Sequence, residues 1–229
     1  MDHYDNDLAT HPGRDGAQLI AIVDYGMGNL RSVWKAFHYL GQEVKITRSA
    51  KELRDARKIV LPGVGAFRDC MENLERLGLV EAIVECIRSG KPYLGICLGL
   101  QILFDESEEF GRTPGLGIVR GKVMRFPPNM PSSGMGPKPY LTVPHIGWNS
   151  VHILKPAPHL CSVPDGSYFY FVHSYYGVPE DPSVVATTTE YGIEFPSSIW
   201  MDNIFACQFH PEKSQSLGLK VLRNFTEME

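Results

Sequence analysis

The sequence predicts an open α/β fold, in which a mostly parallel twisted sheet carries helices on both faces and continues into antiparallel strands near the C-terminus. Three observations support this prediction. Short uninterrupted apolar runs, typical of buried parallel strands, recur along the first hundred residues. Segments with apolar residues at helical spacing lie between these runs. The second half has apolar runs separated by turn-forming residues, which is typical of antiparallel strands.

The N-terminal half alternates strands and helices in regular order. The apolar run at 19–23 predicts a strand, and the apolar spacing from Leu30 to Leu40 predicts a helix that stops at Gly41. The further predicted elements are a strand at 43–47, a helix capped by Ser49, a strand at 58–61, a helical stretch at 67–89 interrupted near Gly78, a strand at 92–94 and a helix start within 98–104. In such folds ligands bind beyond the carboxyl ends of the strands, where the loop after each strand begins.

The second half has a different composition. Residues 111–149 are rich in Gly and Pro, and we expect loops and short strands there, with 127–140 as an inserted loop. The run at 106–109 is expected to be a solvated helix end. Later strands are predicted at 168–172, 184–189, 197–200 and 204–209, followed by a helix at 216–225. We predict that residues 1–17 are a disordered extension and that 18–229 form one domain.

The composition excludes several classes of function. The net charge is −4 with both signs interspersed, so there is no basic footprint for nucleic acid or an anionic membrane. No apolar run approaches the roughly 18 residues of a membrane span, and the polar N-terminus is unlike a secretory signal. The five cysteines contain no C-x-x-C pair, so neither a zinc ribbon nor a disulfide framework is predicted, and no cofactor is implied. This cysteine usage favours the cytoplasm.

The most specific motif is Gly95-Ile96-Cys97-Leu98-Gly99, a G-x-C-x-G run between a predicted strand and a predicted helix. It is the cysteine version of the nucleophile elbow, a strained turn that needs glycine on both sides. The turn raises one side chain above the sheet at a helix N-terminus, where unpaired N–H groups and the helix dipole favour a negative charge. We therefore predict that Cys97 is a nucleophile.

A cysteine nucleophile requires a base to accept its proton and an acid to protonate the leaving group, and histidine can do both near neutral pH. His210 follows a predicted strand, and Pro211 restricts the turn after it. Glu212 lies two residues further on and can reach the second ring nitrogen of His210. We predict a catalytic triad of Cys97, His210 and Glu212.

The reaction also requires donors for the oxyanion that forms on the substrate. The backbone N–H of Leu98, directly after the nucleophile, is one expected donor. A second donor must come from another loop at the strand ends. The Gly-rich turn that contains Val64 is the best source, because glycines let backbone amides approach a ligand. We predict an oxyanion hole formed by Val64 and Leu98.

The elbow together with His210-Pro211-Glu212 resembles the triad-type, or class I, glutamine amidotransferases, whose fold is flavodoxin-like. Four further segments resemble, within that family, the glutaminase subunits of imidazole glycerol phosphate synthases. The resemblance covers the chain from about residue 19 to the C-terminus, and the four segments are Asp24-Tyr25-Gly26-Met27-Gly28-Asn29-Leu30-Arg31-Ser32, Leu61-Pro62-Gly63-Val64-Gly65-Ala66-Phe67, Pro144-His145-Ile146-Gly147-Trp148-Asn149 and Tyr170-Phe171-Val172-His173-Ser174-Tyr175.

The resemblance implies an activity and a partner. Cys97 would attack the side-chain amide of L-glutamine, release ammonia and form a glutamyl thioester that water then hydrolyses to glutamate. Ammonia would pass to a separate (β/α)₈-barrel cyclase subunit, in a heterodimer that makes imidazole glycerol phosphate and aminoimidazole carboxamide ribotide in histidine biosynthesis. The positions that match glutamine-binding residues are Gly63, Gly65, Gln101, Ser174 and Tyr175. The positions that match residues facing the cyclase are Asn29, Trp148 and Lys213, the last paired with an acidic residue of the partner.

The sequence alone also allows other functions for these residues. The chain could be a cysteine peptidase or γ-glutamyl hydrolase on a similar fold, a catalytically silent binding subunit, or an amidotransferase subunit of another pathway. The four cysteines other than Cys97 are expected to be ordinary small side chains. We expect His145 and His173 to make structural hydrogen bonds, and Trp148 to lie at an interface rather than in the core.

Overall fold

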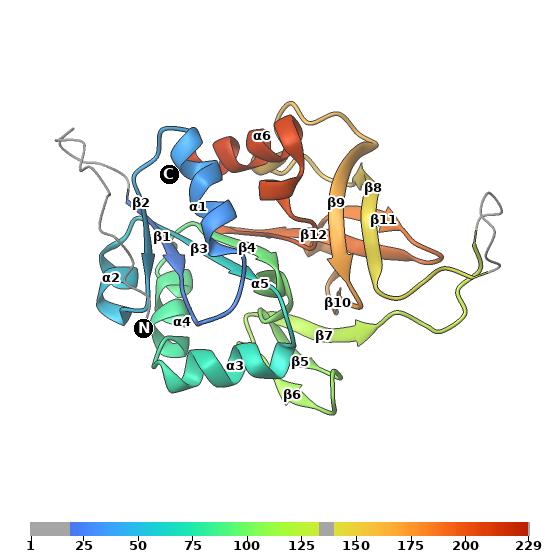
Figure 1. Ribbon diagram of the computed structural model, residues 1–229, viewed down its shortest axis with the longest axis horizontal. Helices are drawn as coiled ribbons and strands as arrows, with labels where there is room; N and C mark the ends of the chain where they lie inside the picture. The colour runs from blue at the N-terminus through green and yellow to red at the C-terminus, as the bar shows by residue number, and fades with distance from the viewer. Residues whose placement is uncertain (1–18, 133–139, 229) are drawn as a thin grey trace, which may run out of the picture.

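The apolar runs of the N-terminal half form parallel strands of one large sheet, in a computed structural model that describes residues 19–132 and 140–228 (Figure 1). The parallel strands are β1 (Ile20–Val23), β2 (Val44–Thr47), β3 (Lys58–Gly63), β4 (Tyr93–Cys97) and β13 (Ile204–Cys207). The antiparallel strands are β8 (His145–Ile153), β9 (Ser167–His173), β11 (Val185–Glu190) and β12 (Glu194–Met201). Neighbours follow the order β2-β1-β3-β4-β13-β12-β11-β8-β9, which confirms the predicted fold class.

A second, four-stranded sheet has the order β10-β7-β5-β6. Its strands are β5 (Phe104–Ser107), β6 (Thr113–Pro114), β7 (Val119–Arg125) and β10 (Tyr175–Pro179). The helices are α1 (Leu30–Tyr39), α2 (Ala50–Asp55), α3 (Phe67–Arg76), α4 (Val80–Arg88), α5 (Leu98–Gln101) and α6 (Gln215–Thr226), with single 3-10 turns η1 (Pro158–Leu160), η2 (Pro182–Val184) and η3 (Pro211–Lys213). The predicted extension at 1–17 and the middle of the predicted inserted loop, 133–139, lie outside the described residues.

Helices cover both faces of the parallel strands because successive side chains of a strand point to opposite faces. Ile20 of β1 belongs to a buried cluster that contains Phe37 of α1 and Val221 of α6. Ala21, the next residue, belongs to the opposite cluster, which contains Ile83 of α4. Figure 1 shows the same division, with α1 and α6 on one side of the sheet and α3 and α4 on the other. The carboxyl ends of β1, β3 and β4 are left free to carry a site.

The chain departs from the sequence predictions directly after the elbow. The helix predicted within 98–104 ends at Gln101, and Phe104 begins a strand. The run at 106–109 is therefore not a helix end, since Glu106 lies in β5 beside β6 and β7. Phe104 is fully buried, and its ring would contact a β-carbon placed at Gly177 of β10 at 2.3 Å. Packing and strand pairing with distant segments thus override the local helical pattern.

Candidate active site

The elbow is formed by Cys97, the last residue of β4, with Leu98 opening α5. Cys97 has φ 54° and ψ −105°, a left-handed backbone conformation that side chains other than glycine rarely adopt. A β-carbon at Gly95 would lie 2.4 Å from the carbonyl oxygen of Gly99, and one at Gly99 would lie 1.8 Å from the carbonyl oxygen of Leu61. Both glycines are required for the close contact of strand, turn and helix that the sequence predicted.

His210 follows β13 and is held on both sides by hydrogen bonds. Its backbone N–H donates to the carbonyl of Tyr170 at 2.9 Å, and its own carbonyl accepts from Ser214 Oγ at 2.7 Å. Pro211 starts the η3 turn, which carries Glu212 back toward the imidazole. The Nδ1–Oε1 distance between His210 and Glu212 is 2.8 Å, with side chains 2 % and 1 % exposed. The carboxylate therefore fixes the ring orientation and the Nδ1 proton.

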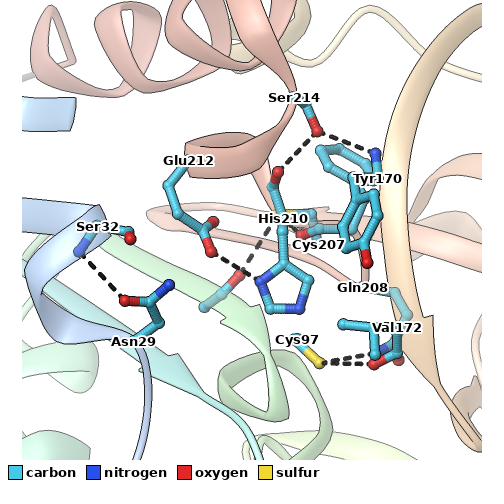
Figure 2. Close-up of polar contacts among 12 residues, drawn as sticks. Asn29, Ser32, Cys97, Tyr170, Val172, Cys207, Gln208, His210, Glu212 and Ser214 are labelled. Carbon is cyan, nitrogen blue, oxygen red and sulfur yellow. Dashed lines mark hydrogen bonds and ion pairs between the residues drawn. The ribbon is translucent and has the colours of Figure 1, made fainter. Parts of the chain in front are cut away.

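The free edge of the His210 ring is turned toward the sulfur of Cys97 (Figure 2). His210 Nε2 is buried, and within the described residues no group forms a hydrogen bond with it. Burial lowers the pKa of His210, but the electrostatic interaction with the adjacent Cys97, followed by the interaction with Glu212, outweighs it and raises the pKa to about 10. The imidazole is therefore protonated at neutral pH and can donate a proton to a leaving group.

The raised pKa of His210 predicts a pH dependence of stability. An imidazole in the unfolded chain has a pKa of about 6.5, so the folded form binds this proton more tightly. That contribution to stability is complete below about pH 6.5 and is lost as the pH rises through about 10. We expect the free energy of unfolding in urea to fall more steeply between pH 7 and 10 in the wild type than in Glu212→Gln. Parallel curves for the two proteins would show that Glu212 does not hold the proton.

The two loops predicted to supply oxyanion donors lie side by side. Gly63, at the end of β3, pairs in register with Cys97 of β4, which brings the next residue, Val64, to the level of the elbow. A β-carbon at Gly63 would lie 2.4 Å from the hydroxyl of Tyr25 and 2.6 Å from Leu98 Cβ. The absence of a side chain at Gly63 lets the loop of Val64 approach the start of α5.

Two of the predicted glutamine-binding residues, Gln101 and Tyr175, share one hydrogen-bond network. Gln101 is 5 % exposed, and its Nε2 donates to the carbonyl of Tyr175 at 2.9 Å and to Gln208 Oε1 at 3.0 Å. Ser174 connects β9 to β10 next to Tyr175, and its carbonyl accepts from the N–H of Phe126. Gly65 has φ 104° at the other side of the elbow, in the loop that follows β3. The structure thus brings Gln101 and Tyr175 together, while Gly63 ends β3 beside the elbow and Gly65 lies in the loop that follows β3.

Gln208 is a residue of the site that the sequence reasoning missed. It is fully buried, and its Nε2 donates to Cys97 Sγ at 3.4 Å (Figure 2). The available signal was a polar residue within the apolar run at 204–209, two positions before His210 on the same segment. A buried side-chain amide in such a run requires partners, which points to a site.

His145 and His173 form a buried pair behind the site. His145 Nδ1 and His173 Nε2 are 3.1 Å apart, and His173 Nδ1 is 2.8 Å from the carbonyl oxygen of Tyr175. Burial lowers the pKa of His145 to about 4 and that of His173 to about 3, so both rings are neutral at pH 7. The expectation of structural hydrogen bonds for these two residues is confirmed.

Two of the three residues predicted to face a partner lie together. The rings of Trp148 and Tyr170 are 6.2 Å apart edge to face, and Lys213 Nζ lies 5.7 Å from the centre of the Tyr170 ring. Trp148 is 46 % exposed, and Ile146 beside it on β8 is 59 % exposed. Asn29 caps α1 through a 3.4 Å hydrogen bond from the backbone N–H of Ser32. In the view of Figure 2, Asn29 and Tyr170 appear on opposite sides of His210.

The structure also bears on metal binding and on membrane insertion. Among residues 19–132 and 140–228, no group of three or more His, Cys, Asp and Glu side chains is arranged to hold a metal ion. In the same part of the chain, no helix has both the length and the apolar character to cross a membrane.

Sequence comparison assigns the chain to one class of enzyme. The sequence model of the family described as "Glutamine amidotransferase class-I" matches residues 21–228. The chain is therefore a glutamine amidotransferase, as the resemblance in sequence predicted.

Curated relatives narrow the family further. A protein of Geobacter sulfurreducens named "Imidazole glycerol phosphate synthase subunit HisH" is 55 % identical over 92 % of this chain and 99 % of the relative. Proteins of the same name from Caldanaerobacter subterraneus and Aquifex aeolicus are 50 % and 52 % identical, over 92 % and 89 % of this chain and 98 % and 94 % of the relatives. The chain belongs to the HisH family, the glutaminase subunits of imidazole glycerol phosphate synthase in histidine biosynthesis.

Solved structures agree on the fold. A structure titled "Structure of PurLQS from Thermotoga maritima" aligns with a TM-score of 0.68 at 19 % identity, covering 92 % of this chain and 98 % of that chain. A second, titled "Crystal structure of glutamine amidotransferase", aligns with a TM-score of 0.67 at 19 % identity, covering 90 % and 97 %. At this identity the likeness concerns the fold alone.

Proposed function

We propose that this chain hydrolyses L-glutamine to glutamate and ammonia with Cys97 as the nucleophile, His210 as acid and base, and Glu212 as the group that orients His210. The observation that carries the proposal is the position of the His210 ring, which Glu212 holds at 2.8 Å on one side while its free edge faces the sulfur at the elbow. The rival peptidase and silent-subunit interpretations lack support from the relatives, which are all HisH subunits among those described above.

The chemistry runs through two tetrahedral intermediates. The sulfur of Cys97 attacks the side-chain carbonyl carbon of glutamine, and the N–H groups of Val64 and Leu98 stabilise the oxyanion. Protonated His210 gives its proton to the departing nitrogen, the C–N bond breaks, ammonia leaves, and a glutamyl thioester remains. Neutral His210 then takes a proton from water, which attacks the thioester, and the C–S bond breaks to give glutamate and Cys97. Gly63, Gly65, Gln101, Ser174 and Tyr175 hold the amino and carboxylate groups of the substrate.

Covalent trapping tests this proposal directly. A glutamine analogue with an electrophilic diazoketone in place of the amide is expected to label Cys97 alone, in a one-to-one ratio, and glutamine is expected to protect against labelling. Peptide mass spectrometry identifies the labelled residue. Labelling of the exposed Cys161 in preference to Cys97, or no protection by glutamine, would contradict the assigned nucleophile.

We also propose that ammonia passes to a separate (β/α)₈-barrel cyclase subunit in a cytoplasmic heterodimer. The word "subunit" in the names of the HisH relatives supports a complex. The exposed side chains of Ile146, Trp148 and Tyr168 support an interface on β8 and β9, since large apolar groups gathered on one face favour a protein partner. Lys213 lies beside this face, and Asn29 completes the predicted contact set.

Charge reversal at Lys213 tests the predicted interface. We expect Lys213→Glu to weaken binding to the cyclase of the same organism at least about 10-fold, because it places a carboxylate against the acidic partner residue. Isothermal titration calorimetry measures the dissociation constant. Lys220→Glu on α6 is the matched control, because its ammonium contacts only the carbonyl of Ser162 among the hydrogen bonds of the described residues. Equal affinities of the two variants would place Lys213 outside the interface.

A further inference from the structure

Gln208 lies against the sulfur of Cys97, and the role inferred for it rests on the proposed function. Among the described residues, two hydrogen-bonding groups lie against the sulfur of Cys97 besides the facing His210 ring: Gln208 Nε2 at 3.4 Å and the carbonyl oxygen of Val172 at 4.0 Å (Figure 2). The carbonyl can only accept a hydrogen bond, so it suits the thiol form of Cys97. The amide of Gln208 can donate, so it suits the negatively charged form, which is the nucleophile.

The direction of the Gln208 amide is set by its hydrogen bond to Gln101 and by the hydrogen bond from Gln101 to Tyr175. The carbonyl of Tyr175 is an acceptor only, so Gln101 must present its NH₂ group there, at 2.9 Å. The second hydrogen of that NH₂ group points to Gln208 at 3.0 Å, which requires Gln208 to place its oxygen toward Gln101. The nitrogen of Gln208 then necessarily faces Cys97. The carbonyl of Tyr175 thus fixes the orientation of the Gln101 and Gln208 amides, so that an N–H group of Gln208 points to the sulfur.

The same carbonyl is held by the histidine pair. Tyr175 O also accepts from His173 Nδ1 at 2.8 Å, which leaves His173 Nε2 as an acceptor for His145 Nδ1 at 3.1 Å. His145 Nε2 is in turn an acceptor, 3.3 Å from Asn149 Nδ2. Each hydrogen bond in this series, from Asn149 to Gln208, has one possible donor and one possible acceptor. Reversing the amide of Gln208 would place two NH₂ groups against each other and leave a buried polar group unpaired.

We propose that Gln208 is a positioning residue for the reaction, whose amide donates to the sulfur of Cys97 and at the same time anchors the substrate-binding side chain of Gln101. Gln208 touches no substrate atom in this role. Its two contacts make separable contributions: the donor to Cys97 affects the chemical step, and the acceptor for Gln101 affects glutamine binding.

Two substitutions separate these contributions. Gln208→Glu keeps an oxygen for Gln101 but replaces the donor beside the sulfur, whereas Gln208→Met keeps the volume and removes both contacts. We expect kcat for glutamine to fall about 10-fold or more in both variants, and KM to rise several-fold only in Gln208→Met. Gln42→Met, the same change at a partly exposed glutamine near β2, is the control and is expected to match the wild type.

Alkylation of Cys97 provides a readout that needs no substrate. Iodoacetamide is expected to modify Cys97 about three- to ten-fold more slowly in both Gln208 variants, with the exposed Cys161 of the same molecule as the internal reference. If wild-type Cys97 reacts no faster than Cys161 and releases no ammonia from glutamine, the proposed function itself fails. If the wild type is reactive and active while both variants alkylate and turn over at its rates, the role of Gln208 is wrong and the proposed function stands.

Discussion

Cys97→Ala is expected to lower glutamine-dependent turnover about 10,000-fold or more, because it removes the sulfur that would form the thioester through which the amide bond is cleaved. The loss should lie in kcat, since the glutamine-binding groups on Gln101 and Tyr175 remain in place. In the complex with the cyclase, added ammonium salts should still support synthesis, because they bypass the hydrolytic step. Ammonia release and product formation are measured separately, with glutamine and with ammonium chloride.

A matched substitution isolates the role of the sulfur. Cys161→Ala removes an exposed thiol, and we expect it to leave both reactions unchanged. Loss of the ammonia-dependent reaction in Cys97→Ala would mean that the variant fails to fold or to dock, and circular dichroism together with binding to the cyclase distinguishes these cases. Residual glutamine hydrolysis above about one per cent of the wild-type rate would exclude Cys97 as the nucleophile.

The turn at Cys97 and the contact between His210 and Glu212 could be predicted because their requirements are local. Gly95 and Gly99 are placed by contacts within a few residues of Cys97 and with the adjacent strand, and this spacing is visible in the sequence. The pair of His210 and Glu212 is likewise local, since the η3 turn between them is set by Pro211. Only the meeting of the two segments depends on the fold, and the parallel pairing of β4 with β13 brings it about.

The parts that escaped prediction depend on distant partners. Residues 104–107 carry no strand signal of their own and become β5 because β6 and β7 pair with them. Gln208 lies in the same motif as His210, but its partner Gln101 is 107 positions away in the sequence. The orientation of its amide is set by Tyr175, which belongs to a third segment. Hydrogen-bond polarity of this kind is a property of the assembled site and cannot be read from spacing.

Gly99→Ala is expected to lower stability more than any other glycine-to-alanine change in the elbow, because the added β-carbon would collide with backbone atoms. The added β-carbon would lie 1.8 Å from the carbonyl oxygen of Leu61 and 3.0 Å from its carbonyl carbon, so a strand of the central sheet would have to move. No rotamer change relieves this contact, because the backbone alone fixes the position of a β-carbon and of the carbonyl that it meets. We expect the free energy of unfolding to fall by at least about 4 kcal/mol, or soluble protein to be lost.

Gly78→Ala provides the contrast that makes this prediction specific. Gly78 has φ 65°, so alanine there is conformationally strained, but its β-carbon would have no neighbour within 4 Å. The expected cost is only about 1–2 kcal/mol, the penalty of the left-handed conformation alone. Urea unfolding of both variants measures the difference. If Gly99→Ala were as stable as Gly78→Ala, then α5 could shift away from β3 at little cost. The close contact between β3, the elbow and α5 would then not be what holds Cys97 in its strained turn at the start of α5.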